Sequence, residues 1–204
     1  MSKTVWDRIE ESRSRCNVLC HPFYVRWSRG ELTLEELGRY AGQYRHAVEA
    51  IATMSSAAAD AAPGRRDLAR HAEEEHSHVK LWDGFVTAVG GSTRAAATPE
   101  TAACVEAWTA DDGLLATLAR LYAIESGQPE ISRTKREGLA AFYGIENGRG
   151  TAYFRVHESR DAEHALQARE LIEELAGAVD GAGIVAAAES TLSANWRLLD
   201  GVDR

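Results

Sequence analysis

Cysteine is scarce in this chain, which contains an odd number of three: Cys16, Cys20 and Cys104. A chain of 204 residues can bury a sufficient core without disulfides, so we expect these thiols to be reduced and structural. Cys16 and Cys20 lie one helical turn apart, but no further Cys or His pair completes a zinc set with them. The sequence therefore predicts neither a disulfide framework nor a thiolate metal site.

Long apolar runs and an excess of basic charge are also missing. No apolar stretch approaches the roughly 20 residues that a membrane-spanning helix needs. The N-terminal stretch MSKTVWDRIEESRSRCN lacks the apolar region of a signal peptide. A formal net charge of −8 argues against a nucleic-acid surface. We therefore expect a cytoplasmic protein that binds neither a membrane nor a nucleic acid.

Proline is scarce too, with four residues in the chain, while alanine and leucine are abundant. This composition favours helices. The helix signals include a capping box at Thr33 and Glu36, a Thr98-Pro99 start, and a break or kink at Pro129. The expected helices cover residues 4–15, 21–30, 33–62, 65–89, 98–110, 114–144 with the break or kink at Pro129, 149–176 and 183–199. The pattern predicts a single all-α domain over residues 1–204, a bundle of seven to eight helices.

The most informative pattern lies in RVHESRDAEHALQARELIEEL. His157, Asp161 and His164 form H-x-x-x-D-x-x-H there. At about 100° per residue, offsets of four and seven keep the three side chains on one narrow stripe of a helix. Imidazole and carboxylate ligands without thiolate suit iron, manganese or zinc. The alternative is a solvated face of a charged helix, so a second set of ligands is needed to decide.

That second set lies in RHAEEEHSHVKLWDGF. Glu75 and His78 form E-x-x-H on a stripe with three-four spacing that includes His71. Ionisable groups on a core-facing stripe are costly unless they are paired or bound to metal. Glu74 shares the face of His78 and could take the place of Glu75. We expect His71 and His76 to lie outside the ligand set.

A third carboxylate, Glu125, follows the apolar run in GLLATLARLYAIESGQPEI and would also need a partner. Glu49, near His46, could be an extra ligand or an ion-pair partner. Carboxylates and histidines on separate inward-facing helices are the ingredients of a dinuclear carboxylate site. Two metal ions about 3.5–4 Å apart can hold a small molecule between them. Spacing alone leaves zinc hydrolysis and O2 activation by iron, alone or with manganese, both open.

These motifs lie in strings that resemble the haem-oxygenase-like superfamily, specifically its dimetal oxidase and oxygenase branch. The strings are HPFYVRWSRGELTLEELGRYAGQY, HVKLW, LYAIESGQPEISRTKREGL, AFYG and YFRVHESRDAEH. The resemblance covers nearly the whole chain, roughly residues 10 to 200. Within the superfamily, the chain most resembles the para-aminobenzoate-forming family related to the Chlamydia protein associating with death domains. The last string is the most specific, because it also supplies three ligands at that family's spacing.

The resemblance implies an all-α haem-oxygenase-like fold, two metal ions (Fe/Fe or Fe/Mn), O2 as co-substrate, a reductant and a homodimer. The implied metal ligands are Glu75, His78, Glu125, His157, Asp161 and His164. The resemblance also implies an activity: the formation of para-aminobenzoate, a folate precursor, from the protein's own tyrosine, with a lysine as the nitrogen donor. Tyr24 and Lys135 would occupy those roles, and Tyr40 and Tyr153 match two further family positions.

Ordinary structural roles compete with these assignments. Tyr24 could be a core aromatic residue with a satisfied hydroxyl. Lys135 lies between Arg133 and Arg136, so a solvated surface lysine is its default. A lysine pointing into an apolar core would instead have a lowered pKa and become a usable amine nucleophile.

Other functions also stay open. Another dimetal oxidase of this fold, acting on a free amino acid or fatty acid, would keep the metals and dispense with Tyr24 and Lys135. A non-enzymatic metal- or protein-binding helical bundle would bind metal without turnover. Thiaminase-like members of the fold use a cysteine nucleophile, and no cysteine here lies beside a ligand motif.

Overall fold

The described part of the chain folds into helices connected by loops. The computed structural model describes residues 3–177 and 181–203, and in these it contains nine α-helices, two short 3-10 helices and no strand. The elements are α1 (Val5–Arg15), η1 (Val18–Cys20), α2 (Pro22–Ser28), α3 (Leu34–Ala61), α4 (Arg66–Ala88), α5 (Pro99–Trp108), α6 (Leu114–Glu125), α7 (Gln128–Tyr143), η2 (Gly148–Gly150), α8 (Ala152–Ala176) and α9 (Ala182–Val202). The all-α fold predicted from the sequence is confirmed.

The helix ends follow the local signals in the sequence. Thr33 caps α3 in a reciprocal box with Glu36, whose backbone N–H donates to the threonine hydroxyl. Pro129 lies in the first turn of α7, where its missing N–H costs nothing, so α6 and α7 are two helices separated at the predicted break. Gly144 ends α7 in the left-handed conformation (φ 68°) that favours glycine.

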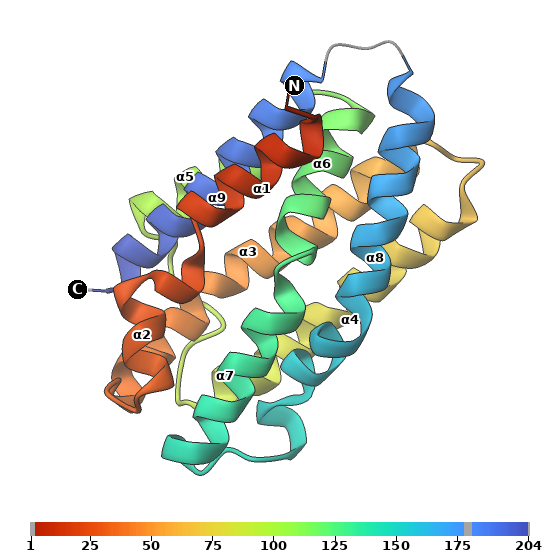
Figure 1. Ribbon diagram of the computed structural model, residues 1–204. Coiled ribbons are helices and arrows are strands. Elements are labelled where there is room, and N and C mark those ends of the chain that lie inside the picture. Colours follow the sequence, from red (N-terminus) through yellow and green to blue (C-terminus); the bar gives the residue numbers. More distant parts are fainter. Residues whose placement is uncertain (1–2, 178–180, 204) are drawn as a thin grey trace.

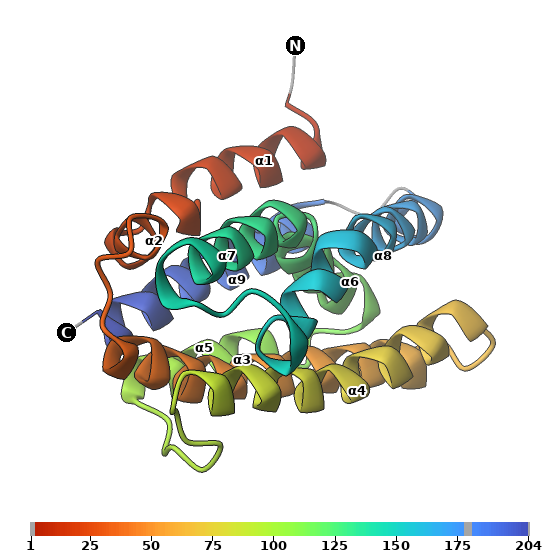
Figure 2. The same ribbon diagram turned by 90° about the horizontal axis from the view of Figure 1, so that it is seen from below.

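The helices form layers that enclose one core. Figure 1 shows α6 and α7 running in series across the middle of the molecule, with α8 beside them. Figure 2 shows α3 and α4 side by side as one layer, with α6, α7, α8 and α9 above it and α1 outermost. The buried apolar residues form a single cluster to which almost every helix contributes. The space between α4, α6, α7 and α8 is therefore the centre of the bundle.

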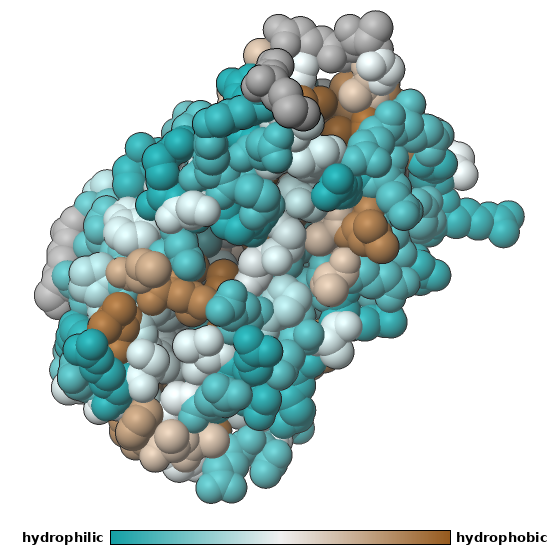
Figure 3. Space-filling view, viewed as in Figure 1, coloured by the Kyte–Doolittle hydropathy of each residue, from teal (hydrophilic) through white to brown (hydrophobic). Residues whose placement is uncertain are grey.

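The surface and the interior differ in an unusual way. The face drawn in Figure 3 is largely hydrophilic, with small scattered apolar patches. No helix in the described part of the chain is long and apolar enough to cross a membrane. The interior, by contrast, holds several ionisable side chains that are buried as deeply as the apolar ones. Because burying such groups is costly, their cluster in the interior is the candidate functional site.

Candidate dimetal site

The predicted ligands come from three helices that face the centre of the bundle. Two lie on α4, one ends α6 and three follow the inner stripe of α8. All six are at most 6% exposed: Glu75, His78, Glu125, His157, Asp161 and His164. Neighbours outside the stripe, including Glu73 and His76, are exposed to solvent. The helical phase expected from the sequence therefore matches the structure on both α4 and α8.

Glu75 lies at the junction of two groups of potential ligands. One group is Glu75, His78 and His157, and the other is His71, Glu75 and His164, with one ligand atom of each residue within 4.8 Å of the others. Within the first group, His78 Nδ1 is 2.9 Å and His157 Nε2 is 3.9 Å from the Glu75 carboxylate. A carboxylate shared by two sets of imidazoles is the arrangement that bridges two metal ions.

His71 lies inside this cluster, contrary to the expectation from the sequence. Its side chain is buried, and its Nε2 atom lies 2.9 Å from Glu125 Oε1 without the alignment of a hydrogen bond. Its ring centroid is 4.2 Å from that of His164. The signal was present in the sequence, because His71 precedes Glu75 by one turn on the same inward stripe.

The two remaining predicted ligands stand at the edge of these groups. Glu125 and Asp161 are buried, yet neither carboxylate makes a hydrogen bond within the described residues. Both carboxylates still interact electrostatically with the cluster, because Glu125 and Glu75 each raise the pKa of Asp161. The structure thus brings all six predicted ligands into one region and adds His71 as a seventh candidate.

Unpartnered polar atoms show that the cluster fits metal ions. Hydrogen-bond partners are absent, among the described residues, for buried nitrogen and oxygen atoms of Glu75, Glu125, His157, Asp161 and His164. Leaving one such group unsatisfied costs about 1–3 kcal/mol, and more when the group is charged. Nitrogen and oxygen donors without thiolate suit iron or manganese, which would satisfy several of these atoms at once.

The carboxylates of the cluster titrate differently. Burial alone would raise the pKa of Glu75, but the imidazoles of His157 and His78 outweigh it and hold that pKa below its usual range. Burial raises the pKa of Asp161 well above its usual range, and His157 only partly opposes this. Asp161 thus lacks sufficient positive charge nearby, which a bound cation would supply.

The geometry favours Glu75 over Glu74 as the shared carboxylate. The Glu74 side chain is 23% exposed, and it lies 3.2 Å from His164 Nε2 and 3.1 Å from Arg160 Nη2. It therefore occupies the outer edge of the cluster. Glu49 lies apart from the cluster and forms an ion pair with Arg45.

A buried chain of hydrogen bonds joins the predicted reactive residues. Lys135 Nζ donates to the Tyr40 hydroxyl over 2.9 Å, and the Tyr40 and Tyr24 hydroxyls are 2.7 Å apart. Lys135 is 1% exposed and is surrounded by aromatic rings, with its Nζ 5.0 Å from the centroid of Tyr24. Burial lowers the pKa of Lys135 to about 7. The surface location that its basic neighbours suggested is wrong.

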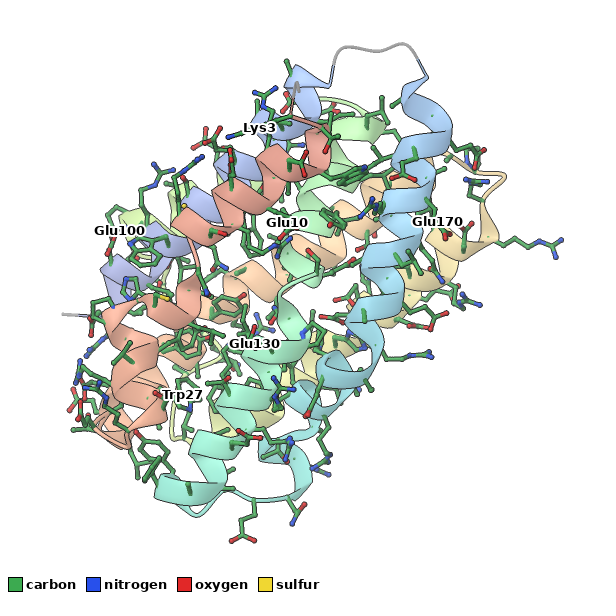
Figure 4. The ribbon with its side chains drawn as sticks, in the orientation of Figure 1. Lys3, Glu10, Trp27, Glu100, Glu130 and Glu170 are labelled. Atoms are coloured by element: carbon green, nitrogen blue, oxygen red, sulfur yellow. The ribbon has the colours of Figure 1, made fainter. Side chains whose placement is uncertain are left out.

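Tyr153 connects this chain to the ligand cluster. Its ring stacks on the imidazole of His157. The same ring lies edge-on to that of Trp82, and the centroids of the Tyr153 and Trp82 rings are 4.8 Å apart. Trp82 in turn packs against Tyr40. The aromatic cluster and the ligand cluster therefore adjoin, and together they occupy the centre of the bundle. On the far side of the aromatic cluster, Trp27 points from α2 toward α7, and its indole N–H donates to the Lys135 carbonyl (Figure 4).

Comparison with sequences of known proteins points the same way. The model of a family described as iron-containing redox enzymes matches residues 38–196. A 4-aminobenzoate synthase from Nitrosomonas europaea is 34% identical, with an alignment that covers 96% of this chain and 88% of that protein. A 4-aminobenzoate synthase from Chlamydia trachomatis is 35% identical over 78% of this chain and 75% of its own length.

Solved structures with low sequence identity share the fold. A TenA homologue from Pseudomonas syringae superposes with a TM-score of 0.83 at 19% identity, covering 98% of this chain and 92% of that one. A domain with a haem-oxygenase-like fold from Shewanella denitrificans gives a TM-score of 0.75 at 17% identity, covering 99% and 93%. The haem-oxygenase-like architecture expected from the sequence is confirmed.

Proposed function

This chain belongs to the family of iron-containing redox enzymes, and on that premise we propose that it forms 4-aminobenzoate from its own Tyr24 in an O2-dependent reaction at a dimetal site. The names of its Nitrosomonas and Chlamydia relatives support the product. The buried chain from Lys135 through Tyr40 to Tyr24 carries the proposal for the source of the ring and nitrogen. Fe/Fe or Fe/Mn ions, with O2 and a reductant, would supply the oxidising chemistry.

The cluster of histidines and carboxylates would hold the two ions. Glu75 would lie between them, with His78 and His157 on one side and His71 and His164 on the other. Asp161 and Glu125 are buried carboxylates that make no hydrogen bond within the described residues, and they could complete the two coordination spheres. The second nitrogen of His157 is already oriented, because its Nδ1 lies 2.8 Å from the Tyr153 carbonyl.

The atoms of the product map onto the tyrosine side chain. The aromatic ring and Cβ of Tyr24 account for the seven carbons of 4-aminobenzoate, so the Cα–Cβ bond must break and Cβ must become the carboxylate carbon. The nitrogen would come from Lys135: its Cε–Nζ bond must break, and the new ring C–N bond replaces the phenolic C–O bond, whose oxygen leaves as water with O2 and the reductant supplying the redox balance. Both residues are fixed in one hydrogen-bonded chain, so no substrate needs to be captured from solution.

Tyr40 would move the proton between the two reacting residues. Its hydroxyl accepts from Lys135 and is hydrogen-bonded to Tyr24. Once the Tyr24 hydroxyl has lost its proton, one proton shift along the chain can carry a proton from Lys135 to the Tyr24 oxygen and leave a neutral amine at Lys135. Burial raises the pKa of Tyr40 well above its usual range, so the hydroxyl stays protonated and acts as a relay. The aromatic walls exclude water from the amine.

Isotope labelling tests the proposal directly. Protein made with ring-labelled tyrosine is given Fe(II), reductant and O2, and the labelled ring should appear in 4-aminobenzoate at one or fewer molecules per chain. Tyr24→Phe should yield no product while retaining its metal content. The matched control is Tyr122→Phe, which removes a hydroxyl on α6 that faces Glu10 instead. Many turnovers on an added compound, with the Tyr24 peptide of unchanged mass, would favour a dimetal oxidase with a free substrate.

The association state is a separate proposal. The homodimer expected from the family resemblance stays a prediction, and light scattering over micromolar concentrations tests it. A monomer throughout that range would reject it.

A further inference from the structure

A pocket of about 130 Å³ opens between α1, the α6–α7 junction and α9. None of the proposed metal ligands lines it, and neither do Tyr24, Tyr40 and Lys135. Its walls are largely apolar and include Val18, Leu19, Ile124, Ile131 and Leu192. Figure 3 shows apolar surface on this face near the C-terminal end of α1. Since an apolar cavity of roughly 150 Å³ binds benzene, the pocket has about the size of one aromatic ring.

The pocket contains hydrogen-bond acceptors that nothing in the described protein uses. Gln128 lines it and is 3% exposed, and its Oε1 atom is buried without a partner. Asn195 lines it from α9, and its Oδ1 atom is also buried without a partner. Two unsatisfied amide oxygens on residues that line one small space call for a ligand that carries N–H or O–H donors.

The same two amides connect the pocket to the reactive lysine. The side chains of Gln128 and Asn195 interact with the hydroxyl of Tyr44. The centroid of the Tyr44 ring lies 4.9 Å from Lys135 Nζ. A single buried tyrosine therefore separates the inner end of the pocket from the amine that is proposed to supply nitrogen.

The lining of the pocket also includes a guanidinium. Arg13 supplies it and donates to the Ala123 carbonyl over 3.3 Å and to the hydroxyl of Ser126. A guanidinium has five N–H donors, so Arg13 keeps donors for a further acceptor even with its bonds to Glu10. Glu130 also lines the pocket and is exposed to solvent. Acceptors, apolar walls and a guanidinium together complement a ring that bears an amine and a carboxylate.

We propose that this pocket binds 4-aminobenzoate, with its amine at Gln128 and Asn195 and its carboxylate toward Arg13, as the product leaves the centre of the bundle. The choice of this aromatic amino acid rests on the proposed function. The pocket would hold the product one residue away from its site of formation. Added 4-aminobenzoate should therefore bind the protein whether or not synthesis has taken place.

Isothermal titration of the full-length chain with 4-aminobenzoate and with benzoate tests this assignment. Benzoate keeps the ring and carboxylate but lacks the amine, so it should bind about tenfold more weakly, the equivalent of one lost hydrogen bond. Gln128→Leu should weaken the binding of 4-aminobenzoate by a similar factor and leave the affinity for benzoate unchanged. Asn195→Leu is a second variant with the same expectation. Gln167→Leu makes the same chemical change at a glutamine that bonds Glu163 on α8, and should change nothing.

Helix content and melting temperature of each variant show whether it is folded. Absence of binding, equal binding of both compounds, or tight binding that neither pocket variant weakens would overturn the assignment. Because titration does not depend on synthesis, the two proposals fail separately. Binding with the expected amine dependence in a protein that yields no labelled product would retain the pocket and reject the proposed reaction. Labelled product without binding would do the reverse.

Discussion

The ring of Tyr153 stacks on the imidazole of His157, with centroids 3.8 Å apart and planes inclined by 22°. The two residues are one turn apart on α8, and the Tyr153 carbonyl also orients the His157 ring through its Nδ1 atom. The Tyr153 hydroxyl is buried and has no hydrogen-bond partner in the part of the chain that the structure describes. The ring, rather than the hydroxyl, is therefore what positions the proposed ligand.

Substitutions at Tyr153 should separate those two parts of the side chain. Tyr153→Phe keeps the stacked ring and removes an unsatisfied hydroxyl, so metal affinity should be unchanged and stability equal or higher. Tyr153→Leu removes the stack, so Fe(II) affinity should fall by about tenfold, a typical loss for a residue that orients a metal ligand. Metal titration and urea unfolding measure the two effects. Equal affinity of the Phe and Leu variants would show that the stack does not orient His157.

His71 should contribute to metal binding although sequence reasoning left it out. Its ring faces His164, and its Nε2 atom is within 4 Å of two buried carboxylates. His71→Ala should lower the Fe(II) content after reconstitution or weaken one of the two ions. His76→Ala is the matched control, because His76 lies on the exposed side of the same helix. Elemental analysis that gave full metal content for His71→Ala, with unchanged affinity, would remove His71 from the ligand set.

The difference between His71 and the other ligands shows what local sequence can predict. Helix starts follow from short-range chemistry, such as the Thr33–Glu36 box and Thr98 before Pro99, and the structure has both. Helical phase predicts which residues of α4 and α8 face inward. Phase alone does not say how far along the inner stripe the centre extends, because that depends on where α6 crosses and places Glu125. Phase therefore places His71 on the inner stripe but does not show whether it reaches the other ligands.

Lys135 illustrates a second limit of local sequence. Its neighbours Arg133 and Arg136 suggest a solvated stretch, but the inner stripe of α7 also includes Ser132 and Leu139, which are fully buried. The partner that holds the ammonium, Tyr40, is far away in sequence on α3. Contacts of that kind depend on how helices pack, so residue types could suggest the pair and only the fold could bring it together.

Burial of Lys135 should cost stability that a non-ionisable residue recovers. The pKa of Lys135 is lowered from about 10.5 in the unfolded chain to about 7 by burial. The unfolded chain therefore binds one more proton than the folded protein between these values, so folding becomes more favourable as pH rises from 7 toward 10.5. Lys135→Met fills similar space without a charge and should stabilise the protein at pH 6 by on the order of 1–3 kcal/mol.

Urea unfolding at pH 6 and pH 9 checks this expectation. The gain of Lys135→Met over the original protein should be larger at pH 6 than at pH 9. Lys80→Met, at an exposed lysine of α4, is the control and should show no such difference. A Lys135→Met variant that is less stable at both pH values would mean that the ammonium is stabilised by its aromatic surroundings.

The same protonation equilibrium should control the formation of product. A protonated Lys135 has no lone pair, so only the neutral amine can form a bond to the ring of Tyr24. With a pKa of about 7, Lys135 loses its proton as the pH rises through neutrality. The single-turnover rate should therefore increase by about tenfold per pH unit below pH 6 and become level above pH 8. Lys135→Arg should give no product at any pH, because a guanidinium stays protonated.

Metal content must be measured at every pH, since acid also protonates the histidines and carboxylates that would hold the ions. With equal metal content, a rate that does not change between pH 6 and pH 9 would show that Lys135 is not the amine that reacts.

Tyr40→Phe provides the complementary comparison. It removes the hydroxyl that links Lys135 to Tyr24, so the rate should fall while the lysine keeps its buried position. A Tyr40→Phe variant with an unchanged rate would exclude the proposed proton relay and leave Lys135 to lose its proton by another route.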